Sequence, residues 1–220
     1  MSTPTTARFA PTFFGKVMTF FGLAVLCSAI GAYLTYTYFI SYFVMYPAMI
    51  YILFIVELAM ILTSRLWSTR SPLNRLMFVL FTFITGVTIA PIIAVLAAST
   101  GGMHILTTAL LATSATFIAT ALLGWTTQMN LSGIRGFLMM ALIGMIITGV
   151  VGIFIPWGNT FETIYAGIGV IVFAGFTAYD FQKIKNYPED RYIDAALNLY
   201  LDIFNLFLYI LRLIMALNRR

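Results

Sequence analysis

The sequence has few charged residues. Only 9% of its 220 residues are Asp, Glu, Lys or Arg, whereas an ordinary soluble domain has about 25%. Two stretches, 17–56 and 76–134, contain no charged residue at all, and one transmembrane helix needs about 20 apolar residues. The composition therefore excludes an ordinary soluble domain. It predicts an integral, multi-pass membrane protein that has the lipid bilayer as its first partner and two spans in each uncharged stretch.

Cysteine and histidine are also scarce, since Cys27 and His104 each occur once. A single cysteine excludes a disulfide framework and a thiolate metal site. The formal net charge of +5 does not indicate nucleic-acid binding, because the basic residues fall between the apolar runs and form no basic face with interleaved aromatic residues. We therefore expect no cofactor and no nucleic-acid partner.

The apolar runs are separated by turn residues such as Gly101-Gly102 and Tyr187-Pro188. They predict an all-α membrane protein with seven transmembrane helices, at Lys16–Phe39, Tyr46–Leu66, Leu76–Ala98, Ile105–Trp125, Phe137–Trp157, Phe161–Phe181 and Asp194–Leu217. We expect one transmembrane domain over residues 1–220, of which residues 1–15 form a short cytoplasmic tail. The first apolar run lacks the small-residue cleavage site of a signal peptide, so we expect it to remain in the mature protein.

Lysine and arginine gather in alternate loops, and cytoplasmic loops carry an excess of these residues. The basic residues of one side are Arg8, Lys16, Arg65, Arg70, Arg75, Arg135, Lys183, Lys185 and Arg191. This pattern predicts a cytoplasmic amino terminus, and the short tails favour a prokaryotic plasma membrane. An odd number of spans sends Arg219 and Arg220 to the far side. The alternative is a re-entrant last helix that returns the tail to the cytoplasm.

The last predicted helix carries one polar seam. At about 100° per residue, Asn198, Asp202, Asn205, Tyr209 and Arg212 fall within an arc of roughly 80°, and the rest of the helix is apolar. A charged side chain that faces lipid near the bilayer centre costs about 2.5–3.5 kcal/mol. The seam should therefore face protein or water, which favours a central position for this helix, surrounded by the other six.

Two aspartates lie near the cytoplasmic ends of the last two predicted helices. Asp180 is near the end of the sixth helix, and Asp202 is about eight residues into the seventh, so the two lie within about two helical turns of each other in depth. If they touch, two charges about 4 Å apart at an effective dielectric near 20 repel by about 4 kcal/mol, and the pair would share one proton. Without that proton, two carboxylates facing a wet cavity would attract a hard cation such as calcium.

Other roles for these residues stay open at the level of sequence. Asp180 could mark the membrane interface with Lys183, one turn away, as its partner. Glu57 and Arg212 could form a structural ion pair between two helices. Arg65 could be a topology residue whose side chain reaches the cytoplasmic surface.

Small residues recur every fourth position on the fifth predicted helix, at Gly144, Thr148 and Gly152. Such spacing lets two transmembrane helices approach closely. It predicts a packing ridge along this helix.

Three segments resemble a known family. The segment FTAYDFQKIKN at 176–186, the segment AALNLYLDIFNLFLYILRL at 195–213 and the segment TTQMNLSGIRGFLMMALIG at 126–144 closely resemble the Bax inhibitor-1 family, also called the transmembrane Bax inhibitor motif family. The length and the order of the segments match a bacterial-type member. The resemblance covers essentially the whole chain, although the first two spans match weakly.

The resemblance implies a seven-helix fold with the last helix at its centre. It also implies a calcium leak across the membrane, controlled by pH through a pair of aspartates that correspond to Asp180 and Asp202. The family pairs an acidic residue of the second helix with an arginine of the seventh, here Glu57 and Arg212. It places an arginine late in the second helix as a latch on the aspartates, for which Arg65 is the candidate.

We therefore expect a pH-sensitive calcium leak channel, with calcium as the transported ion and Asp180 and Asp202 as its transient ligands. The alternatives are a membrane protein that modulates a membrane protease or a stress or cell-death pathway through a membrane-protein partner, and a proton/calcium exchanger. An intramembrane enzyme is the least favoured, because His104 lies far from both aspartates in the predicted topology and neither aspartate has a GxGD-like surrounding. We expect no enzyme activity.

Overall fold

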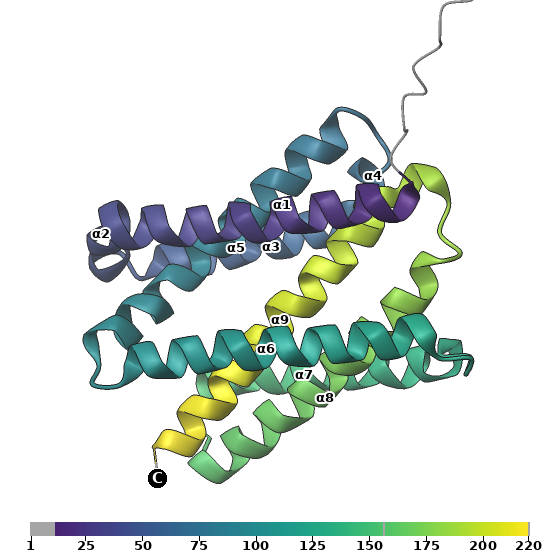
Figure 1. The fold of residues 1–220 in the computed structure, drawn as a ribbon. Coiled ribbons are helices and arrows are strands. Elements are labelled where there is room, and N and C mark those ends of the chain that lie inside the picture. The colour runs from purple at the N-terminus through teal and green to yellow at the C-terminus, as the bar shows by residue number, and fades with distance from the viewer. Residues whose placement is uncertain (1–11, 156, 220) are drawn as a thin grey trace, which may run out of the picture.

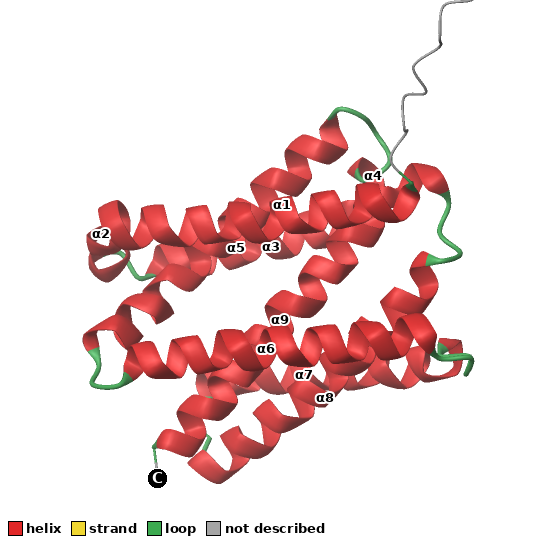
Figure 2. Ribbon diagram, viewed as in Figure 1, coloured by secondary structure: helices red, strands yellow, loops and turns green. Residues whose placement is uncertain are grey.

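Helices form almost the whole chain in the computed structural model, which describes residues 12–155 and 157–219. These residues contain no strand (Figures 1 and 2). The expected cytoplasmic tail, residues 1–15, lies mostly outside the described part. The helices are long and apolar, as the composition predicts, and the protein is an integral, multi-pass membrane protein.

The first helical run is longer than the sequence predicts. It consists of α1 (Phe13–Leu34), a π-helical turn (Thr35–Phe39) and α2 (Ile40–Met45), which together form one candidate span of 33 residues. Thr12 caps its beginning, since the Thr12 side chain accepts a hydrogen bond from the backbone N–H of Gly15 at 3.2 Å. The cap explains why the helix begins before Lys16.

Six helical runs of the described residues are long and apolar enough to cross a membrane. The remaining five are α5 (Leu73–Ala98), α6 (Gly102–Thr126), α7 (Ser132–Phe154), α8 (Asn159–Ile184) and the run Glu189–Asn218, which ends in α9 (Tyr192–Asn218). Each overlaps a predicted span, and the ends differ by a few residues.

The predicted second span, Tyr46–Leu66, is divided in the structure. It forms α3 (Ala48–Leu62) and α4 (Ser64–Trp67), with a break at Thr63. The Thr63 hydroxyl donates back to the carbonyl oxygen of Ala59 at 2.7 Å, and α3 alone is about 22 Å long at 1.5 Å per residue, less than the hydrocarbon core of about 30 Å. The count of seven transmembrane helices is therefore not confirmed.

The long helices form two groups with α9 between them (Figure 1). One group contains α1, α3 and α5, and the other contains α6, α7 and α8. Helix α9 crosses between the groups and packs chiefly against α1, α5, α6 and α8, whereas α3 packs mainly on α5 and α7 on α8. The last helix thus has four main neighbours rather than six. Its residues Leu199, Leu206 and Leu211 are among the most buried side chains of the protein.

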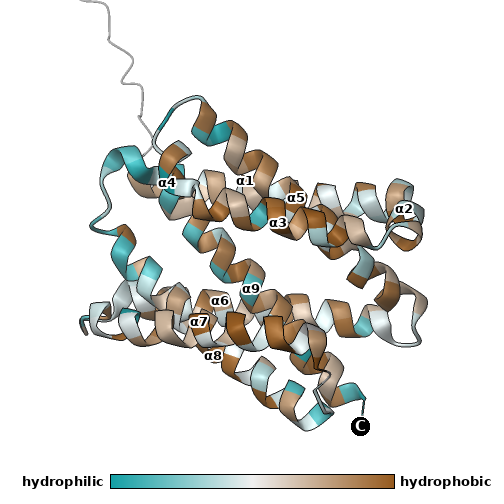
Figure 3. Ribbon diagram, turned by 180° about the vertical axis from the view of Figure 1, so that it is seen from behind, coloured by the Kyte–Doolittle hydropathy of each residue, from teal (hydrophilic) through white to brown (hydrophobic). Residues whose placement is uncertain are grey.

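The outer surface of the bundle is largely apolar (Figure 3). Large side chains such as Leu26, Ile55, Leu111 and Ile171 are more than half exposed. Because a soluble protein rarely exposes so much contiguous apolar surface, this surface is the one that contacts lipid.

Close contacts between helices occur at glycines other than those predicted. A Cβ atom on Gly86 of α5 would collide with the backbone of Ser28 on α1, and one on Gly124 of α6 would collide with the backbone of Ala178 on α8. The predicted ridge on α7 does not form a contact between two long helices, because nothing lies within 4 Å of a Cβ built on Gly144 and a Cβ on Gly152 would meet the side chain of Trp157 in the connection to α8. Helix α7 lies at the edge of the bundle, so most of its side chains are exposed.

The contact at Gly86 can be tested by adding one methyl group. We expect Gly86→Ala to lower the free energy of unfolding by about 1–3 kcal/mol, because the added Cβ forces α1 and α5 apart. The measurement is the thermal unfolding midpoint in detergent micelles. The matched control is Gly144→Ala, for which we expect no loss of stability, since the site is open and alanine favours the helix. Equal midpoints for the two variants would contradict the α1–α5 contact.

Candidate functional site

Asp180 of α8 and Asp202 of α9 meet inside the bundle. Both carboxyl groups are buried, with 8% and 5% of the residue surface exposed, and they lie close enough to share a hydrogen bond. They meet because α8 and α9 are antiparallel neighbours joined by a short connection. One oxygen of Asp202, Oδ2, is fully buried and has no hydrogen-bond partner among the described residues. The structure thus brings together the two aspartates that the sequence singled out.

The positive charges that act on Asp180 come from Lys183 and Arg135. Lys183 does not form an ion pair with Asp180 in the described structure. Its ammonium group donates to the hydroxyl of Tyr187 at 3.1 Å and lies 4.7 Å from the centre of the Tyr187 ring. The interpretation of Asp180 as an interface residue held by Lys183 is therefore not the arrangement observed.

Tyr187 connects the loop after α8 to α9, which the sequence analysis did not anticipate. Its hydroxyl accepts from Lys183 and from Nδ2 of Asn198, each at 3.1 Å. Burial, together with the charges of Asp180 and Asp194, raises the pKa of Tyr187, so the hydroxyl stays neutral. The Tyr187-Pro188 pair indicated a turn, but nothing in the sequence indicated which groups the ring would contact.

Gln182 fixes the segment between α6 and α7 beside the carboxy-terminal end of α8. Its Oε1 accepts from the backbone N–H of Leu131 at 2.8 Å, and its Nε2 donates to the carbonyl oxygen of Met129 at 2.7 Å. A polar cavity of about 470 Å³ lies against these residues, and Tyr179 and Lys183 also line it. Residues 128–132 and 179–186, which carry much of the family resemblance, thus form one surface.

The polar seam of α9 faces α8 over most of its length. Asn198 donates to Tyr187, Asp202 meets Asp180, and the ring of Tyr209 occupies the place where a Cβ of Gly169 would be. Asn205 bonds within its own helix, to the carbonyl oxygen of Leu201 at 2.8 Å. The seam faces protein, as the cost of a charge in lipid requires.

The opposite side of α9 borders an apolar cavity of about 510 Å³. The cavity lies between α1, α5, α6 and α9, and Tyr200, Phe204 and Phe207 line it on the α9 side. Asp202 does not line it. The carboxyl pair and this apolar cavity are therefore on different sides of the same helix.

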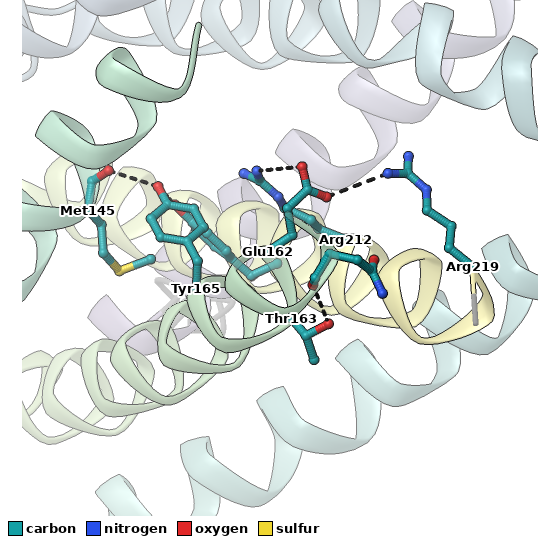
Figure 4. A network of polar contacts seen from close by, with 8 residues as sticks. Met145, Glu162, Thr163, Tyr165, Arg212 and Arg219 are labelled. Atoms are coloured by element: carbon teal, nitrogen blue, oxygen red, sulfur yellow. Dashed lines mark hydrogen bonds and ion pairs between the residues drawn. The ribbon is translucent and has the colours of Figure 1, made fainter. Parts of the chain in front are cut away.

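Arg212 pairs with Glu162 and not with Glu57, so the predicted ion pair between the second and last helices is wrong (Figure 4). Its Nη2 lies 3.7 Å from Oε1 of Glu162, and Arg219 Nη1 lies 3.6 Å from Oε2 of the same residue. The physical reason is the packing, because α3 carries Glu57 and packs on α5, whereas α8 begins beside the end of α9.

Tyr165 joins the same cluster to α7. The guanidinium of Arg212 lies 4.9 Å from the centre of the Tyr165 ring, and the Tyr165 hydroxyl donates to the carbonyl oxygen of Met145 at 2.8 Å (Figure 4). The sequence analysis missed Glu162. The sequence did contain a sign of an acidic partner near the end of α9, since Arg219 follows Arg212 by seven residues and so places a second arginine two turns further along the same seam.

Glu57 finds its partner on α5. Its Oε1 lies 2.5 Å from the hydroxyl oxygen of Thr88, and the residue is 8% exposed. Nothing in the sequence pointed to Thr88, because the pairing of α3 with α5 is a result of the tertiary packing.

Arg65, the candidate latch, lies on α4 and is exposed. It forms no ion pair within the described part of the chain. The cations that act on Asp180 are Lys183 and Arg135 instead, so the structure does not place Arg65 on the aspartates.

The carboxyl pair alone is a small donor set for calcium. A resident Ca²⁺ site uses six to eight oxygen ligands, and the described residues contain no group of three or more His, Cys, Asp or Glu side chains that could hold a metal ion.

Fold and site together define the class: an all-helical, multi-pass membrane protein with two carboxyl groups in contact between its last two helices. The family model described as inhibitor of apoptosis-promoting Bax1 matches residues 10–220, and the chain belongs to this Bax inhibitor-1 family. The match confirms the resemblance that the sequence segments indicated.

Several relatives are similar over most of the chain. The inner membrane protein YbhL of Escherichia coli strain K12 is 34% identical over 172 residues, which cover 71% of this chain and 69% of the relative. The BI1-like protein of Arabidopsis thaliana is 32% identical over 171 residues, covering 76% and 65%. An uncharacterized protein of Borreliella burgdorferi is 32% identical over 216 residues, covering 91% and 90%.

The role of Tyr187 can be tested by removing its hydroxyl. We expect Tyr187→Phe to lower the free energy of unfolding by about 1–3 kcal/mol, because the amide of Asn198 and the ammonium of Lys183 lose their acceptor. The thermal unfolding midpoint in micelles measures this loss. Tyr51→Phe is the control, since Tyr51 is 60% exposed on α3, and its midpoint should not change. A Tyr187→Phe protein as stable as the control would contradict the connecting role.

The partner of Arg212 can be tested with two double-mutant cycles. We expect Glu162→Gln and Arg212→Gln to be coupled by a few tenths to about 1 kcal/mol, a small value because both side chains are partly exposed. Glu57→Gln and Arg212→Gln should be additive, because the two residues do not meet. Unfolding in denaturant measures both cycles. Coupling in the second cycle but not in the first would overturn the assignment.

Proposed function

We propose that the protein is a passive calcium conduit whose permeability is set by protonation of the Asp180–Asp202 pair. The observation that carries the proposal is the contact between two buried carboxyl groups in the interior of the bundle. Two negative charges this close repel by about 4 kcal/mol at an effective dielectric near 20, so the pair holds one proton between its members. Loss of that proton creates a doubly negative site that attracts a hard cation.

The arrangement around the pair fits a closed state of such a conduit. Asp202 is 5% exposed, so an ion cannot reach it without movement of α8 or α9. The cavity of about 510 Å³ beside α9 has an apolar lining, and apolar constrictions in pores block ions by excluding water. Separation of the two carboxylates would open α8 from α9 and connect the pair with the polar cavity near Gln182.

We further propose that α3 and α4 together form the seventh crossing. They run from Ala48 to Trp67, about 20 residues, which is the length that a span requires. With seven crossings the amino terminus is cytoplasmic, on the side that carries most of the Lys and Arg residues. The ion pair between Arg219 and Glu162 supports a complete crossing of α9, because it holds the end of α9 beside the beginning of α8.

A bacterial plasma membrane is the proposed location, in keeping with the Escherichia coli relative named as an inner membrane protein. The proposal requires no resident cofactor and no catalytic group. Calcium and protons are the ligands that act at the carboxyl pair.

The function can be tested in proteoliposomes loaded with a calcium-sensitive dye, from pH 5 to 8. We expect a calcium flux that depends on pH and whose pH dependence is lost in Asp180→Asn and in Asp202→Asn, because one remaining carboxyl group shares no proton. Gel filtration verifies folding. The matched control is Asp190→Asn, which alters an exposed carboxylate in the turn before α9 and should keep the native profile. Native flux no greater than that of protein-free vesicles at every pH would contradict the conduit.

Two alternative functions predict results that differ from those of the conduit. In a proton/calcium exchanger, the flux would follow an imposed pH gradient rather than the absolute pH. The family description, inhibitor of apoptosis-promoting Bax1, favours an interaction protein as the second candidate. In that case a pull-down from native membranes would recover one stoichiometric membrane-protein partner, and the vesicles would show no flux.

A further inference from the structure

Glu57 is a buried acid to which the structure offers no counter-charge. It lies in the middle of α3 and is 8% exposed. No lysine or arginine of the described residues forms an ion pair with it, and Arg212 is engaged with Glu162. A carboxylate without a counter-charge is unfavourable in this position, because a charged side chain inside a membrane protein needs a partner or water.

The contacts around Thr88 bear on where the proton of this site lies. Its hydroxyl oxygen lies 2.9 Å from the carbonyl oxygen of Ile84 and 2.5 Å from Oε1 of Glu57. A hydroxyl has one hydrogen and can donate it to only one of these two acceptors. If Thr88 donates to Ile84, the short contact with Glu57 requires a hydrogen on the carboxyl group. A neutral Glu57 satisfies both contacts, because its carboxyl group donates to the Thr88 hydroxyl and the Thr88 hydroxyl donates to the carbonyl oxygen of Ile84.

The other titratable groups nearby do not remove this requirement. Tyr200 of α9 lies within reach of the charge of Glu57, and Cys27 of α1 lies near Tyr200, but neither of these side chains can carry a positive charge. The Tyr200 hydroxyl is hydrogen-bonded to Thr85, whose own hydrogen goes to the carbonyl oxygen of Thr82. Among the described residues, the polar contacts of α5 with Glu57 and Tyr200 are thus made by the hydroxyl groups of Thr88 and Thr85.

We propose that Glu57 is a second proton-binding site of this protein, a neutral carboxylic acid that donates to Thr88 and holds α3 against α5. Helix α3 has few other anchors, because Glu57 and Met60 are its buried residues. Loss of the proton turns the hydrogen of Thr88 toward the carboxylate and leaves a negative charge against an apolar helix. Deprotonation therefore weakens the α3–α5 contact. The site does not depend on calcium flux or on the aspartate pair.

The test measures the carboxylic-acid C=O stretching band in the infrared spectrum, with the full chain in lipid vesicles at pH 7.5. The background is the double variant Asp180→Asn, Asp202→Asn, which removes the other two buried acids. The acids that remain besides Glu57 are Glu162, Glu189, Asp190 and Asp194, which are ion-paired or exposed. We expect one protonated carboxyl group per chain, which disappears when Glu57→Gln is added and which turns into carboxylate as the pH is raised.

The control variant is Glu162→Gln in the same background, which should leave the band unchanged. Thr88→Val keeps the acid but removes its acceptor, so the band should remain and move to higher frequency. Gel filtration confirms folding of each protein. If the double variant does not fold, Glu57→Gln in the native chain should reduce the band by one carboxyl group. Absence of a protonated carboxyl band at pH 7.5, or a band that Glu57→Gln does not alter, would overturn the proposal.

Discussion

A carboxyl group inside an apolar helix bundle must find a proton, a hydrogen-bond donor or a counter-charge in the protein, because no bulk water solvates it there. The buried acids of this chain satisfy that requirement in two ways. Asp180 and Asp202 meet each other, and Glu57 meets a threonine hydroxyl. Glu162, which is less buried, lies between two arginines near the end of α9. The positions of α3, α8 and α9 follow from these contacts as much as from apolar packing.

The contact of α8 with α9 illustrates how one seam serves several purposes. At one end Tyr187 accepts from Asn198, in the middle the aspartates meet, and at the other end Arg212 binds Glu162. Neutral hydrogen bonds and a partly exposed ion pair close the two ends, whereas the middle contains two groups that repel each other when both are charged. The two ends of the α8–α9 contact thus hold in either protonation state, whereas its middle depends on whether the aspartates share a proton. In the proposed function, protons therefore act on the middle of the contact and leave the fold intact.

Helices α1, α3 and α5 are held together by different contacts. Helix α1 fits closely on α5, where Gly86 leaves no space for a Cβ atom against Ser28. Helix α3 packs on the same α5 with few buried residues and one short polar contact. Because dispersion contacts are individually small, a helix with so little buried surface depends strongly on its single polar anchor. The protonation of Glu57 thus bears on the position of α3, and α8 and α9 have a separate acid pair.

Local sequence determined where six of the long apolar helices lie, their approximate ends and the polar seam of the last helix, because hydropathy and the period of 3.6 residues are properties of a single segment. The same argument identified Asp180 and Asp202, since both carboxylates stand in apolar runs at similar depth. Tertiary structure alone decided that Thr63 divides the second span, that Arg212 takes Glu162 rather than Glu57, that Thr88 faces Glu57 and that Gly86, not Gly144, lies in a close helix contact. Each of these depends on which helix lies beside which, and that choice results from the packing of the whole bundle rather than from any one stretch of residues.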